Sequence, residues 1–211
     1  MVAWTSTSVV IIPIKSFTGA KERLASALTE PERHKLARFM ALRVFRAAAP
    51  LPVLVVCDDD EVTAWSLLNG ATVVRQEKPG LNNAVQSGFV AARDAGYQWA
   101  VIAHSDLPLA NRLDHLLDHL FDHLRDGLPD LESNSDSTAV IVGDQHGDGT
   151  NVLVLATSCN FEFNYGPASF AAHCAQAAKL GLDLRIVADA ALAIDIDTPS
   201  DLAHLPSNWR D

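Results

Sequence analysis

The chain is poor in cysteine and has no C-x-x-C pair. Its three cysteines, Cys57, Cys159 and Cys174, lie far apart in the sequence. This spacing indicates neither a zinc knuckle nor a disulfide framework. We therefore expect buried or half-buried free thiols in a reducing cytosol.

Long hydrophobic runs are also missing. The apolar stretch 9–14 is too short to span a membrane, and Lys15 follows it directly. No segment resembles a signal peptide. The sequence predicts a cytoplasmic protein that has no membrane partner.

Basic residues are scarce. Lys and Arg number 16 against 26 Asp and Glu, which gives a formal net charge of −10. The overall field of such a chain does not attract nucleic acid or anionic lipid. Any phosphate must then be bound by a local basic loop or through a bound cation. With 48% hydrophobic residues among 211 and no evident linker, we expect one globular domain over residues 1–211.

Strand-like and helix-like segments alternate along the chain. Strands are predicted at 9–14, 53–56, 72–74, 99–103, 139–142, 152–155, 184–187 and, as a last short one, 194–197. Helices are predicted from Thr29 up to the Pro50–Pro52 region, at 61–69, 81–95, 111–126 and 169–180, and as a final turn from Thr198. This order is typical of an α/β fold with a mostly parallel central sheet flanked by helices.

An acidic string, D-I-D-T-P, begins at Asp195. In extended backbone, Asp195 and Asp197 point to the same side, and Mg²⁺ prefers such hard oxygen ligands. The alternative is a simple turn. Asp106, in H-S-D-L-P, is a third candidate ligand, although this segment could equally be a helix-entry turn. We expect His104 to be structural or neutral rather than a catalytic base.

A basic loop follows the first predicted strand. It brings Lys15, Lys21 and Arg23 together with Gly19. The glycine allows backbone N–H groups to approach a ligand, and the cations can neutralise a triphosphate. The loop is neither a P-loop nor a dinucleotide fingerprint. Its alternative role is a solvated surface loop.

Two further polar segments could bind ligands. Asn82 and Asn83 open a predicted helix, where one of them is expected to cap and either could read a base edge. The loops around Thr150 and around Gly166 and Ser169 carry hydroxyl and N–H groups at a helix start, which suit a carboxylate or phosphate. Ser169 could also serve as the N-cap of that helix.

Aspartate–histidine pairs recur every four residues on the predicted helix 111–126. They lie at 114–115, 118–119 and 122–123. Histidines at i and i+4 can chelate zinc. The interleaved Leu116, Leu120 and Leu124 mark a buried face, however, so we interpret the pairs as solvated helix surface.

Six segments in order resemble the phospho-acid guanylyltransferases of coenzyme F-420 biosynthesis. The segments read P-I-K-S-F-T-G-A-K-E-R-L, L-N-N-A, S-D-L-P-L, G-D-G-T-N, F-N-Y-G-P-A-S-F-A-A-H and I-D-I-D-T-P-S-D-L. They are spread along the sequence, so the resemblance extends over nearly the whole chain. The resemblance implies a nucleotidyltransferase α/β fold. It also implies transfer of GMP from GTP to 2-phospho-L-lactate, phosphoenolpyruvate or 3-phospho-D-glycerate, with release of pyrophosphate.

The resemblance also implies residue roles. Asp106, Asp195 and Asp197 match the Mg²⁺ ligands, and Thr150, Gly166 and Ser169 match the positions that bind the phospho-acid. GTP is expected at the basic loop, with Lys15, Lys21 and Arg23 catalytic, and at Asn82 and Asn83. A homodimer is a possible assembly. Ser105 stands where the family frequently has Gly or Ala. Ala168 occupies a position that varies in the family, beside the expected acceptor pocket, so the choice among the three acceptors stays open.

Two rival functions remain. A molybdenum-cofactor or sugar-phosphate nucleotidyltransferase of the same fold typically opens with a glycine-rich L-x-G-G-x-G-x-R-like loop, where this chain has I-P-I-K-S-F-T-G-A-K-E-R. A non-catalytic GTP-binding module would bind GTP without releasing pyrophosphate.

Overall fold

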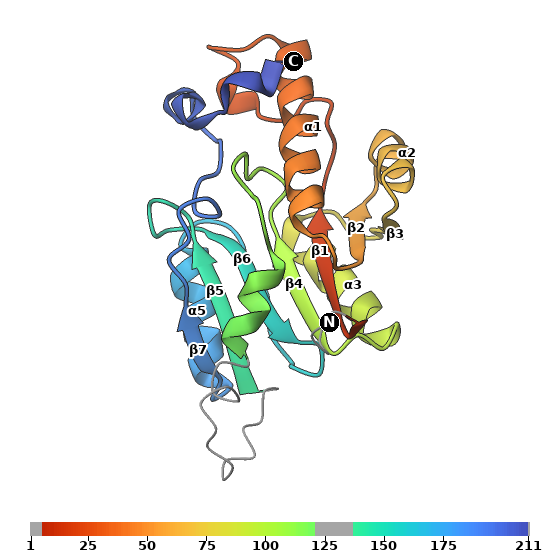
Figure 1. Cartoon of the computed structure of the whole chain (residues 1–211), viewed down its shortest axis with the longest axis vertical. Coiled ribbons are helices and arrows are strands. Elements are labelled where there is room, and N and C mark those ends of the chain that lie inside the picture. Colours follow the sequence, from red (N-terminus) through yellow and green to blue (C-terminus); the bar gives the residue numbers. More distant parts are fainter. Residues whose placement is uncertain (1–5, 121–136, 211) are drawn as a thin grey trace.

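A central β-sheet carries helices on both faces (Figure 1). The computed structural model describes residues 6–120 and 137–210. Its strands are β1 (Ser8–Pro13), β2 (Val53–Cys57), β3 (Thr72–Arg75), β4 (Trp99–Ala103), β5 (Thr138–Gly143), β6 (Thr150–Ala156) and β7 (Asp183–Ile186). Its α-helices are α1 (Glu30–Ala47), α2 (Asp60–Leu68), α3 (Leu81–Asp94) and α5 (Ser169–Lys179). Its 3₁₀ helices are η2 (Glu22–Leu24), η3 (Asp114–Leu117), η5 (Pro199–His204) and η6 (Ser207–Arg210).

The sheet is mostly parallel, as predicted. Its strand order is β3-β2-β1-β4-β6-β5-β7. Strands β1 to β4 pair in parallel, and so do β5 and β7, whereas β6 runs antiparallel to both of its neighbours. The start of β6 therefore lies at the same edge as the ends of β1, β2 and β4. Ligands of open α/β sheets bind at this edge.

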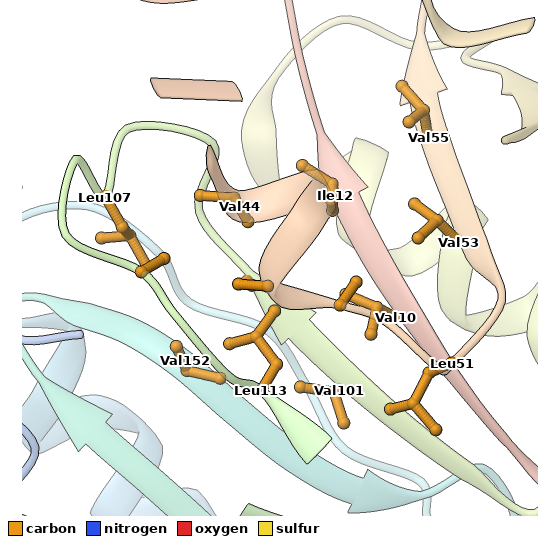
Figure 2. Close-up of a cluster of buried hydrophobic side chains, with 14 of the residues drawn as sticks. Val10, Ile12, Val44, Leu51, Val53, Val55, Val101, Leu107, Leu113 and Val152 are labelled. Atoms are coloured by element: carbon orange, nitrogen blue, oxygen red, sulfur yellow. The ribbon is translucent and has the colours of Figure 1, made fainter. Parts of the chain in front are cut away.

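Each face of the sheet has its own apolar core because side chains alternate along a strand. Val10 and Ile12 of β1 join the core that includes Val44 of α1 and Leu113 (Figure 2). Val9 and Ile11 face the other core, beneath α3 and α5. On that side a Cβ placed on Gly88 would lie 2.6 Å from Ile11 Cγ2. The missing side chain thus lets α3 lie close against the sheet.

The helix starts read from the sequence are confirmed at two places. Thr29 and Glu32 form a capping box at the start of α1, with Pro31 in the first turn. Thr198 and Asp201 form a second capping box at η5. In both cases a side chain supplies partners for N–H groups that the helix itself leaves free.

The predicted strand 194–197 is wrong. These residues have no regular secondary structure and pair with no strand in the described part of the chain. Ile194 and Ile196 instead pack into a third apolar cluster, with Leu36 and Met40 of α1 and with Trp209. The alternation that resembled a strand reflects this one-sided burial, which leaves the intervening acids on the opposite side.

The helix predicted over 111–126 starts differently. Residues 111–113 are not helical, and Leu113 N–H donates to Ala47 O at 2.8 Å, which ties this segment to the end of α1. The chain then forms η3 and helical turns over 118–120. Leu116 and Leu120 are buried as predicted. Residues 121–126, with the third aspartate–histidine pair and Leu124, lie outside the described residues.

Within the described residues, no helix is long and apolar enough to cross a membrane. The three cysteines are free thiols, with Cys57 buried and the other two half-buried.

Candidate active site

A cavity of about 720 Å³ lies at the edge where β1, β2 and β4 end and β6 begins. This volume falls in the usual range for small-molecule sites. Residues far apart in sequence line it: the loop after β1 contributes Lys15 and Arg23, and the loop after β4 contributes His104, Ser105 and Asp106. Thr150 at the start of β6, Ser169 at the start of α5, and Asp195 and Asp197 also line it.

The three predicted metal ligands all line this cavity. Lys21 lies between two of them: its Nζ is 2.7 Å from Asp106 Oδ2 and 2.9 Å from Asp197 Oδ1. Burial alone would lower the pKa of Lys21, but the two carboxylates outweigh it and raise that pKa. Lys21 is therefore a fixed ammonium that neutralises part of the acidic cluster. It has a left-handed backbone, with φ 54°.

Asp195 is the acid that Lys21 does not bind directly. Burial, followed by repulsion from Asp106 and Asp197, raises the pKa of Asp195 to about 6. On Asp106, burial opposes ionisation but the nearby Lys21 lowers the pKa, and the buried Oδ1 atom has no hydrogen-bond partner. The cluster therefore has more negative charge and more oxygen acceptors than one ammonium can satisfy.

These features fit a Mg²⁺ ion. All the donors are hard carboxylate oxygens, one is an orphaned buried atom, and a cation already bridges two of the acids. As they stand, with Lys21 between them, no three acidic, histidine or cysteine side chains among the described residues are grouped tightly enough to hold an ion. A bound ion would need Lys21 to move or the carboxylates to turn.

The cations of the predicted basic loop divide into two kinds. Lys15 and Arg23 line the cavity and are both exposed. Arg23 Nη1 lies 3.4 Å from Asp197 Oδ2, with its side chain 78% exposed. Lys21, in contrast, is 12% exposed and held by carboxylates. Lys15 and Arg23 are therefore placed to meet an incoming phosphate, Arg23 by giving up one exposed ion pair, whereas Lys21 would first have to leave two close carboxylates.

Carboxylates dominate the cavity wall. Besides the three predicted ligands, Asp58, Asp144 and Asp148 also line it. Among the described residues, the lining then has six carboxylates against two cations. Such a wall repels an anionic substrate unless a further cation is present.

The two asparagines of α3 have structural partners. The Asn82 side chain accepts from Tyr165 N–H at 2.6 Å and donates to Tyr165 O at 3.3 Å. Asn83 Nδ2 donates to Pro79 O at 2.8 Å. The prediction that one of them caps the helix is wrong, because Gly80, with φ 107°, occupies the N-cap. Neither residue is among those that line the cavity; Gly80, Leu81 and Ala84 are.

The predicted phospho-acid residues lie together where β6 and α5 begin. Thr150 opens β6, and its N–H donates to Ser169 Oγ at 3.0 Å. Gly166 has φ 130°, a backbone conformation that favours glycine. All three line the cavity, although Thr150 and Ser169 are almost fully buried, with 0% and 2% of their surface exposed. The alternative role of Ser169 as N-cap is wrong: Ala168 is the N-cap, and Ser169 is the first helical residue.

Two structural acids of this wall were not predicted. The Asp144 carboxylate accepts from the N–H groups of His146, Asp148 and Gly149 at 3.0, 3.0 and 2.8 Å. The Asp148 carboxylate accepts from Ala168 N–H at 3.2 Å and so ties the turn to the start of α5. Only the G-D-x-x-G-D-G spacing of a tight turn could have indicated them from sequence.

Comparisons with known proteins give one family. The family model "Guanylyl transferase CofC like" matches residues 8–206. A phosphoenolpyruvate guanylyltransferase from Rubrobacter xylanophilus is 33% identical over 201 residues, covering 94% of this chain and 93% of the relative. A 2-phospho-L-lactate guanylyltransferase from Methanocaldococcus fervens is 30% identical over 197 residues, covering 93% and 83%.

Solved structures confirm the fold. A nucleotidyl transferase from Methanothermobacter thermautotrophicus superposes with a TM-score of 0.60 at 15% identity, covering 96% of this chain and 97% of that one. A protein assigned as a nucleotide-diphospho-sugar transferase, from Desulfovibrio desulfuricans G20, gives 0.70 at 16% identity, covering 97% and 90%. The predicted nucleotidyltransferase fold and the predicted family are both confirmed, and the chain belongs to the CofC-like guanylyl transferases, a family of nucleotidyltransferases.

Proposed function

We propose that this chain transfers GMP from GTP to the phosphate of a three-carbon phospho-acid, with release of pyrophosphate, in coenzyme F-420 biosynthesis. The acceptor is 2-phospho-L-lactate, phosphoenolpyruvate or 3-phospho-D-glycerate. Relatives named for the first two acceptors match the chain at similar identity, so the comparisons do not favour one over the other.

One observation carries the proposal. A single cavity has an acidic cluster of Asp106, Asp195 and Asp197 on one wall and the hydroxyl groups of Thr150 and Ser169 on another. The first wall suits a divalent cation, and the second suits an anionic group of a small acid. A reaction between two anions needs both kinds of wall in one site.

The chemistry requires no general base. An oxygen of the acceptor's phosphate, already anionic at pH 7, attacks the α-phosphorus of GTP. The new P–O bond forms as the bond from the α-phosphorus to the pyrophosphate oxygen breaks, and pyrophosphate leaves with the electron pair. Catalysis then depends on positioning and on neutralisation of charge. Mg²⁺ on Asp106, Asp195 and Asp197 would supply that charge to the nucleotide phosphates.

The chain's own groups divide the remaining work. Lys15 and Arg23 are exposed at the cavity and are placed to hold the leaving pyrophosphate. Lys21 lowers the pKa of Asp106, pairs with Asp197, and becomes available to phosphate oxygens if it is released from both carboxylates. Thr150, Gly166 and Ser169 hold the acceptor, with hydroxyl and N–H donors directed at its anionic groups.

A panel assay tests the proposal. The full chain is incubated with Mg²⁺ and one nucleotide (GTP, CTP or UTP), together with each of the three phospho-acids in turn or with a sugar phosphate. Products are detected by mass spectrometry, and pyrophosphate release is measured alongside. We expect a guanylylated phospho-acid when the nucleotide is GTP, and no product when it is CTP or UTP. Product from a sugar phosphate only, or GTP binding without pyrophosphate release, would refute the proposal.

A further inference from the structure

His173 contacts Thr150, which lines the cavity, but does not itself belong to the lining, and the chemistry above makes no use of it. It belongs to α5 and is fully buried. Its ring centroid is 4.7 Å from that of Tyr165 and 5.7 Å from that of Phe161. A buried imidazole with both nitrogens in contact with the protein has a fixed hydrogen-bond direction, and that direction can be read from its partners.

One partner fixes the tautomer. The backbone N–H of Asn164 donates to His173 Nε2 at 3.0 Å. A backbone N–H can only donate, so Nε2 must present its lone pair. Burial, followed by repulsion from His104, lowers the pKa of His173 to about 4. The ring is therefore neutral at pH 7 and has its one proton on Nδ1.

The Nδ1 proton determines what Thr150 can do. His173 Nδ1 lies 3.0 Å from Thr150 Oγ1, and with the proton on Nδ1 the hydroxyl oxygen must accept. The hydroxyl proton of Thr150 is then left for a different acceptor. The same holds for Ser169, since its Oγ accepts from the N–H of Thr150 at 3.0 Å.

These bonds form a one-way chain of donors. It runs from Asn164 N–H to His173 and on to Thr150, and a separate bond runs from Thr150 N–H to Ser169. Each protein donor in this chain points at a lone pair of its acceptor, so the protons of both hydroxyl groups stay free to be donated to a ligand. An anionic carboxylate or phosphate binds through donated protons.

We propose that His173 is a positioning residue for the phospho-acid, because its donation to Thr150 Oγ1 commits the Thr150 hydroxyl group to act as a donor toward the acceptor's anionic group, beside a Ser169 hydroxyl that the N–H of Thr150 commits in the same way. The inference rests on the proposed function, since it presumes that the acceptor binds at this wall. It assigns His173 no contact with the substrate and no proton transfer.

A double-mutant cycle tests the link. His173→Phe keeps a ring and removes both nitrogens, and Thr150→Val keeps the shape of the side chain and removes its hydroxyl. The KM for the best acceptor should rise about tenfold in His173→Phe, the usual effect of one lost hydrogen bond. The KM for GTP should change by less than about twofold, because His173 acts only on the residues that hold the acceptor. A general loss of structure would instead raise the KM values of both substrates. Adding His173→Phe to Thr150→Val should cause no further rise.

A second variant covers the case in which His173→Phe folds poorly. In His173→Gln the amide oxygen can accept from Asn164 N–H and the amide N–H can donate to Thr150. We expect an acceptor KM within about threefold of wild type. Calorimetric titration of the acceptor into each protein, in the absence of GTP, should give the same order of affinities.

The outcomes separate the two proposals. A wild-type protein that turns over none of the phospho-acids overturns the proposed function and this inference with it. An active wild type overturns the inference alone if His173→Phe raises the two KM values equally, or if the two substitutions add. It is also overturned if His173→Gln gives no rescue while His173→Phe and Thr150→Val both show the acceptor-specific rise.

Discussion

The two walls of one cavity are built on opposite physical plans. The wall of Asp106, Asp195 and Asp197 is crowded with charge, and one ammonium neutralises it only in part. At the wall of Thr150 and Ser169 the proposed ligand groups are neutral hydroxyls whose hydrogen bonds are set from behind by the protein, and the two acids of that wall, Asp144 and Asp148, are held by backbone N–H groups. The first wall gains its order from a cation, whereas the second is ordered already. The first should therefore respond strongly to charge and ions, and the second to direction.

The largest expected effect is on the acidic wall. Asp197→Ala removes a proposed metal ligand and one of the two carboxylates that hold Lys21. We expect turnover to fall by at least about a thousandfold, as when a main charge-stabilising group is lost. Mass detection of the guanylylated product with Mg²⁺ present measures it. Asp183→Ala, on β7 and away from the cavity, is the matched control and should keep normal turnover. Near-normal activity of Asp197→Ala would remove the metal assignment.

The second effect contrasts two cations of the same loop. Lys21→Met leaves Asp106 and Asp197 without their buried counter-ion, and we expect it to reduce the free energy of unfolding by about 3 kcal/mol. Arg23→Met removes an exposed ion pair and should cost less than about 1 kcal/mol. Urea unfolding without divalent ions measures both variants. Adding Mg²⁺ should recover more stability in Lys21→Met than in Arg23→Met. Equal losses would mean that the acidic wall needs no internal cation.

The third effect is the pH dependence of the acidic wall. The folded-state pKa of Asp195 is about 6, above the ordinary 3.8. Between these values the folded state binds more protons than the unfolded state, so stability decreases as pH rises from about 4 to 6 and the full cost persists above pH 6. Asp195→Asn removes this cost. A shift of this size corresponds to about 3 kcal/mol, and because Asp195 is partly exposed, solvent screening reduces the expected gain over wild type to about 2 kcal/mol above pH 6, with no difference near pH 4.

Urea unfolding across that pH range, without divalent ions, measures the difference between Asp195→Asn and wild type. Saturating Mg²⁺ should abolish it by stabilising the ionised wild type alone. A difference that is constant with pH would show that Asp195 is not strained by its neighbours.

The sequence predicts the acidic wall better than the neutral one for a physical reason. Carboxylates that directly follow a strand indicate a ligand site at the edge of the sheet by their residue type and position alone. The lysines of the loop after β1 indicate it in the same way. Neither pattern predicts that Lys21 lies between Asp106 and Asp197, because these contacts are long-range: Asp106 is 85 positions from Lys21 in the sequence, and Asp197 is 176 positions from it. The strands and most helices were likewise readable from local pattern. The segment 194–197 was misread because the burial of Ile194 and Ile196 in a cluster with α1 gives the same alternation as a strand.

The neutral wall depends on long-range partners that no local pattern specifies. His173 stands in an ordinary helical stretch, and its function appears only when Asn164 and Thr150 are placed against its two nitrogens. Asn82 and Asn83 are adjacent and identical in type, so the sequence treats them alike. The structure separates them: one bonds across 83 positions to Tyr165, and the other bonds within its own turn.

The smallest expected effect tests that separation. Asn82→Ala removes both side-chain bonds to the backbone of Tyr165, next to Gly166 at the neutral wall. Asn83→Ala removes one bond to Pro79 O, in the turn that leads into α3. We expect Asn82→Ala to raise the acceptor KM by about three- to tenfold, the range of one or two modest hydrogen bonds, and to leave the KM for GTP nearly unchanged. Steady-state kinetics with each substrate varied in turn measures both, and Asn83→Ala is the control with little effect on either. The opposite result, a selective rise in the KM for GTP in Asn82→Ala, would mean that Asn82 leaves Tyr165 to bind the nucleotide, and that the neutral wall is less rigid than its hydrogen bonds indicate.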